Sequence, residues 1–373
     1  MKKYAFFITI WFLLNLQAQT NYTAIPDANF EAALSAYDDI AGDHQIPTAA
    51  IDTITVLNVE SQNISDLTGI QDFAALTDLR CGYNQITTLD LTQNLNLELL
   101  MASDNQLTNI DISQNTNLYY LSVWTNQLNQ LDVSHNPNLV YIFAANNHLS
   151  QLDVSQNTHL YRLDCRNNQL TQLDVSVNTN LWWIDCARNQ ISQLDVSNLT
   201  NLHRLEAYNN QLTSLNLDQN GQMDWLRLQN NQLTELHIQN GNNSYLDPAY
   251  FDLRNNPDLY CVFVDDATWC SQNLTNIDPQ THFVTNQAEC DADIESITKN
   301  EIKLYPNPVS NELHILTGQS TEYRIYNIQG AILQQGIIAK ESNKISVNHL
   351  RKGLYIIQLL NDKKAINQVF IKR

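Results

Sequence analysis

Residues 160–180 read LYRLDCRNNQLTQLDVSVNTN, and this 21-residue unit determines how the chain folds. From Leu76 to Asn243 the unit recurs eight times without a gap, opened by Leu in seven copies and by Met223 in the eighth. Counting the opening residue as position 1, positions 1, 4, 6, 11, 14 and 16 are apolar in every copy, and position 9 is always Asn. Such a short fixed period predicts a solenoid, because one unit cannot bury its apolar face without neighbours.

Each unit has two halves with similar patterning. Positions 3–7 alternate between outward and inward residues, which predicts a short strand. Stacked units then form a parallel sheet with strands about 4.8 Å apart. The second half repeats the rhythm, so we expect further extended backbone on the opposite face. A unit this short has little room for a helix, and the sequence therefore predicts a β-rich, flattened coil.

The pattern L-x-x-L-x-Φ-x-x-N-x-L (Φ is apolar) fits Leu160 to Leu170 and resembles the leucine-rich repeat. The resemblance covers residues 53 to about 260 and implies a leucine-rich-repeat solenoid with a parallel sheet. Residues 20–52 precede the repeats, and there Asp27 can cap a short helix that has Phe30 and Leu34 on one face. We interpret 20–52 as an N-terminal cap and 53–290 as the solenoid with its C-terminal cap.

The N-terminus and the charge distribution indicate an exported protein. Residues 1–19 are typical of a signal peptide, with Lys2 and Lys3 before 13 mostly apolar residues, Tyr4–Leu16. That run is too short to span a bilayer, and we expect no transmembrane segment. Residues 20–298 hold seven Arg, no Lys and 34 acids, a net charge of −27. Because a surface with this much negative charge repels the phosphate backbone, nucleic acid is not expected as a partner.

Two polar columns run along the repeats. The Asn at position 9 is predicted to bond backbone groups where the chain leaves the strand. An acidic column occupies position 15: Asp90, Asp111, Asp132, Asp153, Asp174 and Asp195. It could bind calcium, since carboxylates are preferred ligands. We favour local hydrogen bonds to backbone N–H groups, because no D-x-D-x-D spacing or glycine-rich loop accompanies it. No metal site and no cofactor are therefore predicted.

The cysteines fall into two sets. Cys81, Cys165 and Cys186 occupy inward position 6 and are expected to be buried thiols. Cys261, Cys270 and Cys290 lie in the C-terminal cap. The segment Asn256-Pro-Asp-Leu-Tyr-Cys261, followed by Cys290, resembles the end of many bacterial repeat proteins of this type. That resemblance implies a Cys261–Cys290 disulfide and leaves Cys270 unpaired.

The composition changes after the polar linker predicted at 291–300, because residues 299–373 hold 11 Lys or Arg against five acids. The motifs Tyr305-Pro306-Asn307-Pro308 and Leu350-x-x-Gly353-x-Tyr355, with alternating strands around them, closely resemble the type A sorting domain of the type IX secretion system. The resemblance covers residues 301–373. It implies a small β-sandwich, contact with the type IX secretion machinery, and a place at the cell surface or in the medium.

The candidate binding residues lie on the outward side of the first half-unit. Between residues 76 and 243, all 11 aromatic residues and all six Arg fall there, whereas the second half carries neither. Residues 21 apart should be neighbours on adjacent strands, so the outward residues at position 3 from Tyr120 to Trp225 form one column of Tyr, Arg and Trp side chains. The predicted ligand-binding residues are Tyr120, Trp124, Tyr141, Phe143, Arg162, Trp183, Arg204, Tyr208, Trp225 and Arg227.

This composition favours a binding protein. Tyr, Trp and Arg dominate protein-binding hot spots, so a protein partner is expected on this face. Two alternatives stay open: a carbohydrate ligand stacked on the aromatic rings, and a structural surface protein without a specific ligand. We find no nucleophile elbow, P-loop, dinucleotide fingerprint or zinc spacing, so an enzyme is not expected and no catalytic residue is assigned.

Overall fold

The computed structural model describes residues 21–291, 304–315, 320–338, 344–361 and 364–373. The predicted signal peptide, and all but the first residue of the predicted linker, lie outside these ranges. The chain divides into two compact units, Met1–Leu259 with Gln272–Gln280, and Tyr260–Ser271 with Thr281–Arg373. Each unit is described by itself below.

The first unit begins with a small cap. Strands β1 (Tyr22–Ala24) and β2 (Gln45–Pro47) pair antiparallel, and helices α1 (Ala28–Ala33) and α2 (Thr48–Ile51) accompany them. The predicted N-cap is confirmed, because one oxygen of Asp27 accepts from the Asn29 and Phe30 amides. The other accepts from the Ser65 amide at 2.8 Å, which ties the cap to the first turn of the solenoid. Phe30 is fully buried.

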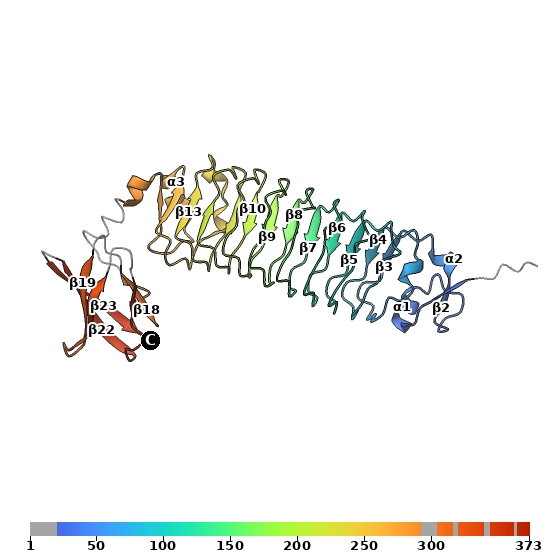
Figure 1. Cartoon of the computed structure of the whole chain (residues 1–373), viewed down its shortest axis with the longest axis horizontal. Helices are drawn as coiled ribbons and strands as arrows, with labels where there is room; N and C mark the ends of the chain where they lie inside the picture. The colour runs from blue at the N-terminus through green and yellow to red at the C-terminus, as the bar shows by residue number, and fades with distance from the viewer. Residues whose placement is uncertain (1–20, 292–303, 316–319, 339–343, 362–363) are drawn as a thin grey trace, which may run out of the picture. The chain divides into compact units, whose positions relative to one another are not determined.

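The solenoid's main sheet is parallel and has ten strands (Figure 1). Residues 21 apart are paired neighbours in the regular repeats, as predicted, for example Ile142, Leu163 and Ile184. The strands, in spatial order, are β3 (Val56–Asn58), β4 (Asp78–Arg80), β5 (Leu99–Met101), β6 (Tyr120–Ser122), β7 (Tyr141–Phe143), β8 (Arg162–Asp164), β9 (Trp183–Asp185), β10 (Arg204–Glu206), β12 (Trp225–Arg227) and β14 (Phe251–Asp252).

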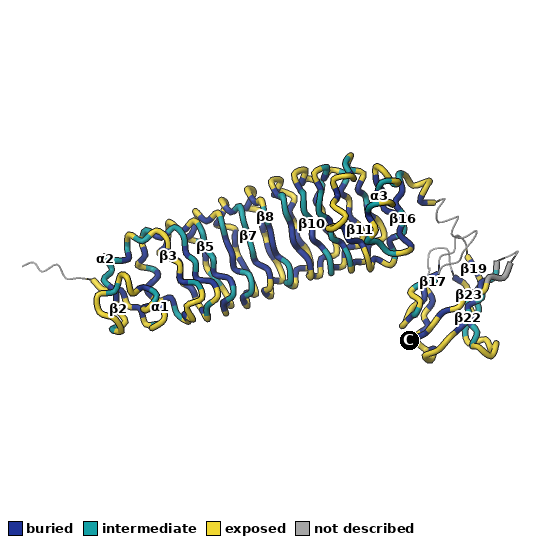
Figure 2. Tube along the Cα trace, turned by 180° about the vertical axis from the view of Figure 1, so that it is seen from behind, coloured by how far each residue is buried: buried dark blue, intermediate teal, exposed yellow. Residues whose placement is uncertain are grey.

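The inward positions form a continuous core. Figure 2 shows a buried band that follows the stacked turns. Within one turn, Leu160, Leu163, Cys165, Leu170 and Val175 have no exposed surface. The thiols of Cys81, Cys165 and Cys186 are buried and free, as expected.

The second half of each turn differs from the prediction. We expected extended backbone along the whole opposite face, but in the described part of the first unit it forms strands only in two late turns, β11 (Ser214–Asn216) and β13 (Glu235–Ile238). Earlier turns add one isolated bridge, Asp90–Asp111. The position-15 Asp side chain accepts the amide two residues ahead, as Asp153 does from Ser155 at 2.9 Å. Asn216 makes the same bond to Asp218 within β11, so this local bond does not by itself exclude a strand.

Three short 3₁₀ turns complete this unit: η1 (Ile70–Asp72), η2 (Asn243–Tyr245) and η3 (Pro248–Tyr250).

The Asn columns join successive turns. At position 9, Asn105 donates to the Cys81 carbonyl of the previous turn at 3.0 Å and accepts from the Ile86 amide at 3.0 Å. A second column behaves similarly, since Asn115 donates to the carbonyls of Leu91 and Asn94. Because the same bonds recur in turn after turn, these amides satisfy backbone groups that the interior would otherwise leave unpaired.

The residue before the position-9 Asn has a left-handed backbone. Nine such residues have φ between 52° and 61°: Tyr83, Asp104, Thr125, Asn146, Asn167, Arg188, Asn209, Asn230 and Asn255. Asn tolerates this conformation, whereas a β-branched residue is strained in it. The side chains also bond across turns, because Asn167 donates to Asn146 at 2.7 Å and Asn146 to Thr125 at 3.2 Å.

Thr125→Asn is therefore expected to stabilise the protein by about 1 kcal/mol, because Asn is less strained in the left-handed conformation. The amide oxygen of the new Asn can still accept the hydrogen bond from Asn146. Urea denaturation of the purified chain measures the change. Asn146→Thr is the matched control and should lower stability by a similar amount. A Thr125→Asn protein that unfolds at lower urea than wild type would contradict this account.

The second unit contains two groups of strands. In the first, β15 (Cys261–Val264) pairs parallel with β16 (His282–Val284), and α3 (Ala267–Asn273) lies between them in sequence. Cys261 and Cys290 form a disulfide, with Cα atoms 5.9 Å apart. This is the pair that the resemblance implied. Cys270 is buried and free.

The second group is a β-sandwich. One sheet contains β17 (Leu304–Tyr305), β18 (Glu312–Ile315) and β21 (Lys344–Ser346). The other contains β20 (Ile332–Ile338), β19 (Thr321–Asn327), β22 (Gly353–Asn361) and β23 (Lys364–Lys372), all antiparallel. One apolar cluster, with Leu313, Ile325 and Phe370 among its members, draws on both sheets. The predicted sandwich is therefore present.

Candidate binding face

The central column of outward residues has the predicted order. Strand register places Tyr120 beside Tyr141, and then Arg162, Trp183, Arg204 and Trp225 in succession. All six side chains are half-buried. Because each backbone position is held by a strand on both sides, the column is a rigid strip.

Two arginines of the column lie between aromatic rings. The guanidinium of Arg162 is 4.0 Å from the centroid of Trp183 and 5.3 Å from that of Phe143. The guanidinium of Arg204 is 4.8 Å from Trp225 and 5.0 Å from Trp182. Cation–π attraction of this kind is worth about 0.5–2 kcal/mol, more where water is excluded. The aromatic and cationic groups therefore fix each other's orientation.

Further aromatic contacts widen the strip at both ends. Tyr120 packs against Tyr141 and Phe143, with centroids 5.6 and 5.5 Å apart. Trp225 stacks on Tyr250 at 3.5 Å, and Arg227 lies 5.0 Å from the Trp225 centroid. The structure thus brings together eight of the ten predicted binding residues.

The remaining two predicted residues lie near the edge where the strands end, at position 7. Trp124 contacts Tyr83, edge to face, with centroids 6.0 Å apart. Tyr208 lies 5.9 Å from the guanidinium of Arg188. Tyr83 and Arg188 were not among the predicted binding residues, although both occupy the left-handed position of their turns.

The sequence interpretation missed a column of buried acids on the same strands. Asp164, Asp185 and Glu206 are paired neighbours on β8, β9 and β10, and none is more than 9% exposed. Arg166 bonds Asp185 at 2.9 Å and lies 3.6 Å from Asp164, and Arg227 lies 3.8 Å from Glu206. The signal was available, because all three acids occupy position 5 of the unit.

Burial governs the titration of these acids. It raises the pKa of Asp164 to about 7, and the negative charge of Asp185 adds to the effect. Burial likewise raises the pKa of Asp185, against the opposing influence of Arg166. It also raises the pKa of Glu206. Desolvation disfavours the charged form of a carboxyl, which is why burial acts in the same direction on all three.

A shallow hollow lies at the edge where the strands begin. Tyr141, Tyr161 and Trp182 line it together with His159, Asn180 and Asn201. Tyr161 and Trp182 are stacked with centroids 5.8 Å apart, and His203 continues the row 5.2 Å from Trp182. Aromatic rings and side-chain amides therefore meet in one place.

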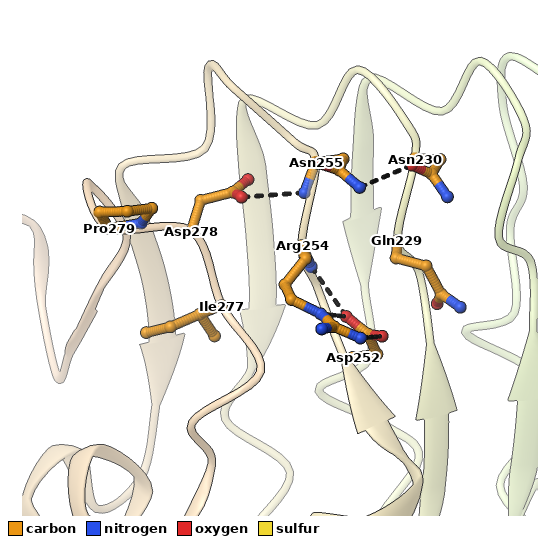
Figure 3. A pocket seen from close by; sticks show the side chains of 8 residues that line it. All are labelled: Gln229, Asn230, Asp252, Arg254, Asn255, Ile277, Asp278 and Pro279. Carbon is orange, nitrogen blue, oxygen red and sulfur yellow. Dashed lines mark hydrogen bonds and ion pairs between the residues drawn. The ribbon is translucent and has the colours of Figure 1, made fainter. Parts of the chain in front are cut away.

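A second pocket, near the C-terminal end of the solenoid, is lined by polar side chains that bond groups of the pocket wall (Figure 3). Arg254 turns onto Asp252, with Nε 2.9 Å from Oδ1. Asp278 points toward Asn255 and accepts its amide at 2.9 Å and that of Asn256 at 2.7 Å. These charged groups hold the last turns together.

The position-15 Asp column makes the local bonds that we favoured. Each of the six accepts the amide of the residue two ahead at 2.9–3.0 Å. Hydrogen bonds from Ser155 lower the pKa of Asp153, and the others behave alike. Among the described residues, the one group of acids, His or Cys whose ligand atoms lie within 4.8 Å of each other is Glu31, Asp38 and Asp43 in the N-terminal cap.

The repeating strand, the buried Leu positions and the Asn that bonds the turn define a leucine-rich-repeat solenoid. Residues 303–373 match the family described as a secretion system C-terminal sorting domain. The chain is thus a bacterial leucine-rich-repeat protein with a type IX sorting domain, which directs it to the cell surface or the medium. In the described residues, no helix is long and apolar enough to cross a membrane.

Proteins of Listeria monocytogenes are among those to which the repeats are similar. Internalin J of serotype 4b (strain F2365) is 41% identical over 78 residues, which are 21% of this chain and 8% of that protein. The functional domain of InlJ, which includes a cysteine ladder, has a TM-score of 0.59 and 35% identity, covering 70% of this chain and 61% of that domain. An internalin, inlF, has a TM-score of 0.48 and 19% identity, covering 70% and 91%.

Proposed function

We propose that this chain is an exported, non-enzymatic binding protein that engages a protein partner through the strand face of its repeats. The observation that carries the proposal is the central column, in which Arg162 and Arg204 are each held between aromatic rings. Arg, Trp and Tyr are the residues most enriched in binding hot spots. A preformed strip also loses little side-chain entropy when a partner binds.

The buried acids favour binding over catalysis. A raised pKa often marks a catalytic carboxyl. Here, however, Asp164 and Asp185 are 5% and 0% exposed, and Arg166 occupies their outer side. A general acid must reach the proton that it transfers. These carboxyls therefore lie beside the central column, in the same row as Phe143 and Arg227, and are paired with arginine. The similarity of the repeats to a functional domain of InlJ also supports a role for the solenoid itself.

A carbohydrate ligand is the second candidate. The hollow lined by Tyr161, Trp182, Asn180 and Asn201 combines aromatic rings with side-chain amides. Amides can donate to and accept from sugar hydroxyls. A glycan array probed with the purified mature chain, run beside capture of proteins from the organism's surroundings, separates the two ligand classes.

Trp183→Ala is expected to weaken a captured protein partner at least tenfold, because a hot-spot aromatic contributes about 2 kcal/mol or more. Tyr141→Ala should act similarly. Affinity is measured by titration calorimetry with purified partner, well below the melting temperature. The contact between Trp183 and Arg162 also stabilises the fold, so a lower melting temperature is expected as well.

Three variants control for general effects. Gln172→Ala and Gln193→Ala lie on the uniform second half of the turn, and Tyr245→Ala removes an aromatic side chain that is 61% exposed outside the strip. All three should bind like wild type. Loss of binding in the Gln variants, with the Trp183 variant intact, would place the partner on the opposite face.

A further inference from the structure

The residues that identify the sorting domain are used to build it. Asn307 of the Y-P-N-P motif donates to the Val369 carbonyl at 3.0 Å and accepts the Ile371 amide at 2.9 Å. It thereby fixes the edge strand β23. Tyr355 is 7% exposed and donates to the Arg351 carbonyl at 2.6 Å. These motif side chains therefore serve the fold, and Tyr355 is too buried to contact a partner.

One face of the sheet formed by β20, β19, β22 and β23 is buried. Tyr323, Ile325, Ile357 and Phe370 point to that side and belong to the apolar core. The residues between them in sequence point outward, because side chains alternate along a strand. Strands β19, β22 and β23 lie side by side (Figure 1), and their register shows which outward residues meet.

The outward face has an apolar end. Register aligns Ile332, Tyr326, Ile356 and Val369 in one row across all four strands. The next row pairs Leu354 with Ile371. Four of these residues are 45–50% exposed: Ile332, Leu354, Val369 and Ile371. We name these six residues the outer apolar patch. A contiguous exposed apolar patch usually marks a contact with another molecule.

The other end of the same face is polar. There Arg324 and Gln358 are paired neighbours, and Gln358 donates to Asn367 at 3.0 Å. Ile337, beside Glu322, is an exposed apolar residue at this polar end. The face therefore offers one apolar site and, on the same sheet, a position for a matched control.

Cations flank the outer apolar patch. Arg351 and Lys352 precede Leu354 by three and two residues, Arg373 follows Ile371 by two, and all three cations are exposed. Two copies of this chain placed face to face would bring these like charges together, which disfavours self-association. A partner with an apolar centre and an acidic margin fits this surface.

We propose that the outer apolar patch is the surface on which the sorting domain docks to a protein subunit of the type IX secretion machinery. Residues 303–373 match a secretion sorting domain, so a recognising partner is implied. The patch supplies the apolar contact, Arg351, Lys352 and Arg373 supply charge complementarity, and the sequence motif holds β23 in place beneath them.

The test is export of the full chain in its native host. Val369→Glu places a charge in the patch, and we expect at least tenfold less protein outside the cell, with accumulation in the periplasm. Leu354→Glu should act in the same way. Ile337→Glu makes the same substitution at a side chain that is 68% exposed outside the patch, and it should be exported like wild type.

Three outcomes would overturn the proposal. Normal export of both patch variants would show that the secretion machinery does not bind the patch. Equal loss of export in Ile337→Glu would show that any added charge on this sheet is harmful. A dimer of the purified chain, or its binding to anionic lipid vesicles, that Val369→Glu abolishes would assign the patch to a second copy or to a membrane.

Two controls separate folding and sorting from docking. Circular-dichroism melts of the purified full-length variants should match wild type, since both substituted side chains face outward. Deletion of 301–373 should stop export altogether. If the deletion variant is retained while Val369→Glu is exported normally, residues 301–373 are needed for export but the outer apolar patch is not the docking surface.

Discussion

Leu163→Asp is expected to unfold several neighbouring turns of the solenoid together. Leu163 is fully buried and lies between Ile142 and Ile184, which are also fully buried. An unpaired carboxylate in such a site is costly, because burial removes its hydration without supplying a partner. Each turn contacts only its neighbours, so a defect in one turn removes an interface on both sides. We expect a loss of about 4 kcal/mol or more, which is exceptional for a single substitution.

Urea denaturation of the mature chain, followed by circular dichroism, measures this loss. Gln172→Asp is the matched control, because it adds the same charge to an exposed position of the same turn. Its unfolding midpoint should stay close to that of wild type. A Leu163→Asp protein that unfolds cooperatively at the wild-type midpoint would show that the register of inward positions is wrong.

The same period explains why much of the site could be predicted. A strict 21-residue repeat means that sequence spacing translates directly into strand register, so the neighbours of Trp183 follow from arithmetic alone. The positions of Arg162 and Arg204 in the central column were predicted in this way. What the period could not supply is the side-chain conformation that places each guanidinium between two rings, because that depends on the particular residues in adjacent turns.

The missed features have a common cause. The left-handed position holds Asn in five of the nine turns but Tyr83, Asp104, Thr125 and Arg188 in the others, so residue type alone did not reveal a shared backbone conformation. The acids at position 5 were likewise hidden, because the same position holds Phe143 in one copy and Arg227 in another.

Arg166→Met is expected to destabilise the protein strongly at pH 8 and much less at pH 5. Arg166 is the cation that bonds Asp185 at 2.9 Å, and it also lies 3.6 Å from Asp164. Arg166 is 41% exposed but Asp185 is fully buried, so removing the cation leaves a buried carboxylate uncompensated, which costs about 3 kcal/mol. The loss depends on pH because the carboxyls that remain can take up protons.

The sign of the effect follows from the raised pKa values. Burial holds the pKa of Asp164 at about 7, so between pH 4 and pH 7 the folded state binds more protons than the unfolded state. The contribution of this group to stability therefore falls as pH rises through that range. Arg166 lowers the pKa of both Asp164 and Asp185, and its removal should extend the decline to higher pH.

Arg80→Met provides the control. Arg80 pairs with Asp78 at 2.8 Å on the same sheet, but the two side chains are 39% and 17% exposed, so the pair is hydrated. Exposed pairs contribute about 0–1 kcal/mol, and the variant should change little at either pH. The denaturant guanidinium chloride is a salt and would screen such ion pairs, so urea is used as the denaturant at both pH values.

A loss of equal size at pH 5 and pH 8 in Arg166→Met would contradict this account. Arg166 would then act through the packing of its methylene groups, since the protonation state of Asp164 and Asp185 would make no difference. A loss confined to high pH would instead show that Arg166 compensates the charge of the acids beside the central column in the wild-type chain. The column carrying Arg162, Trp183 and Arg204 would then present its own cations to a partner, beside acids whose charge is already offset.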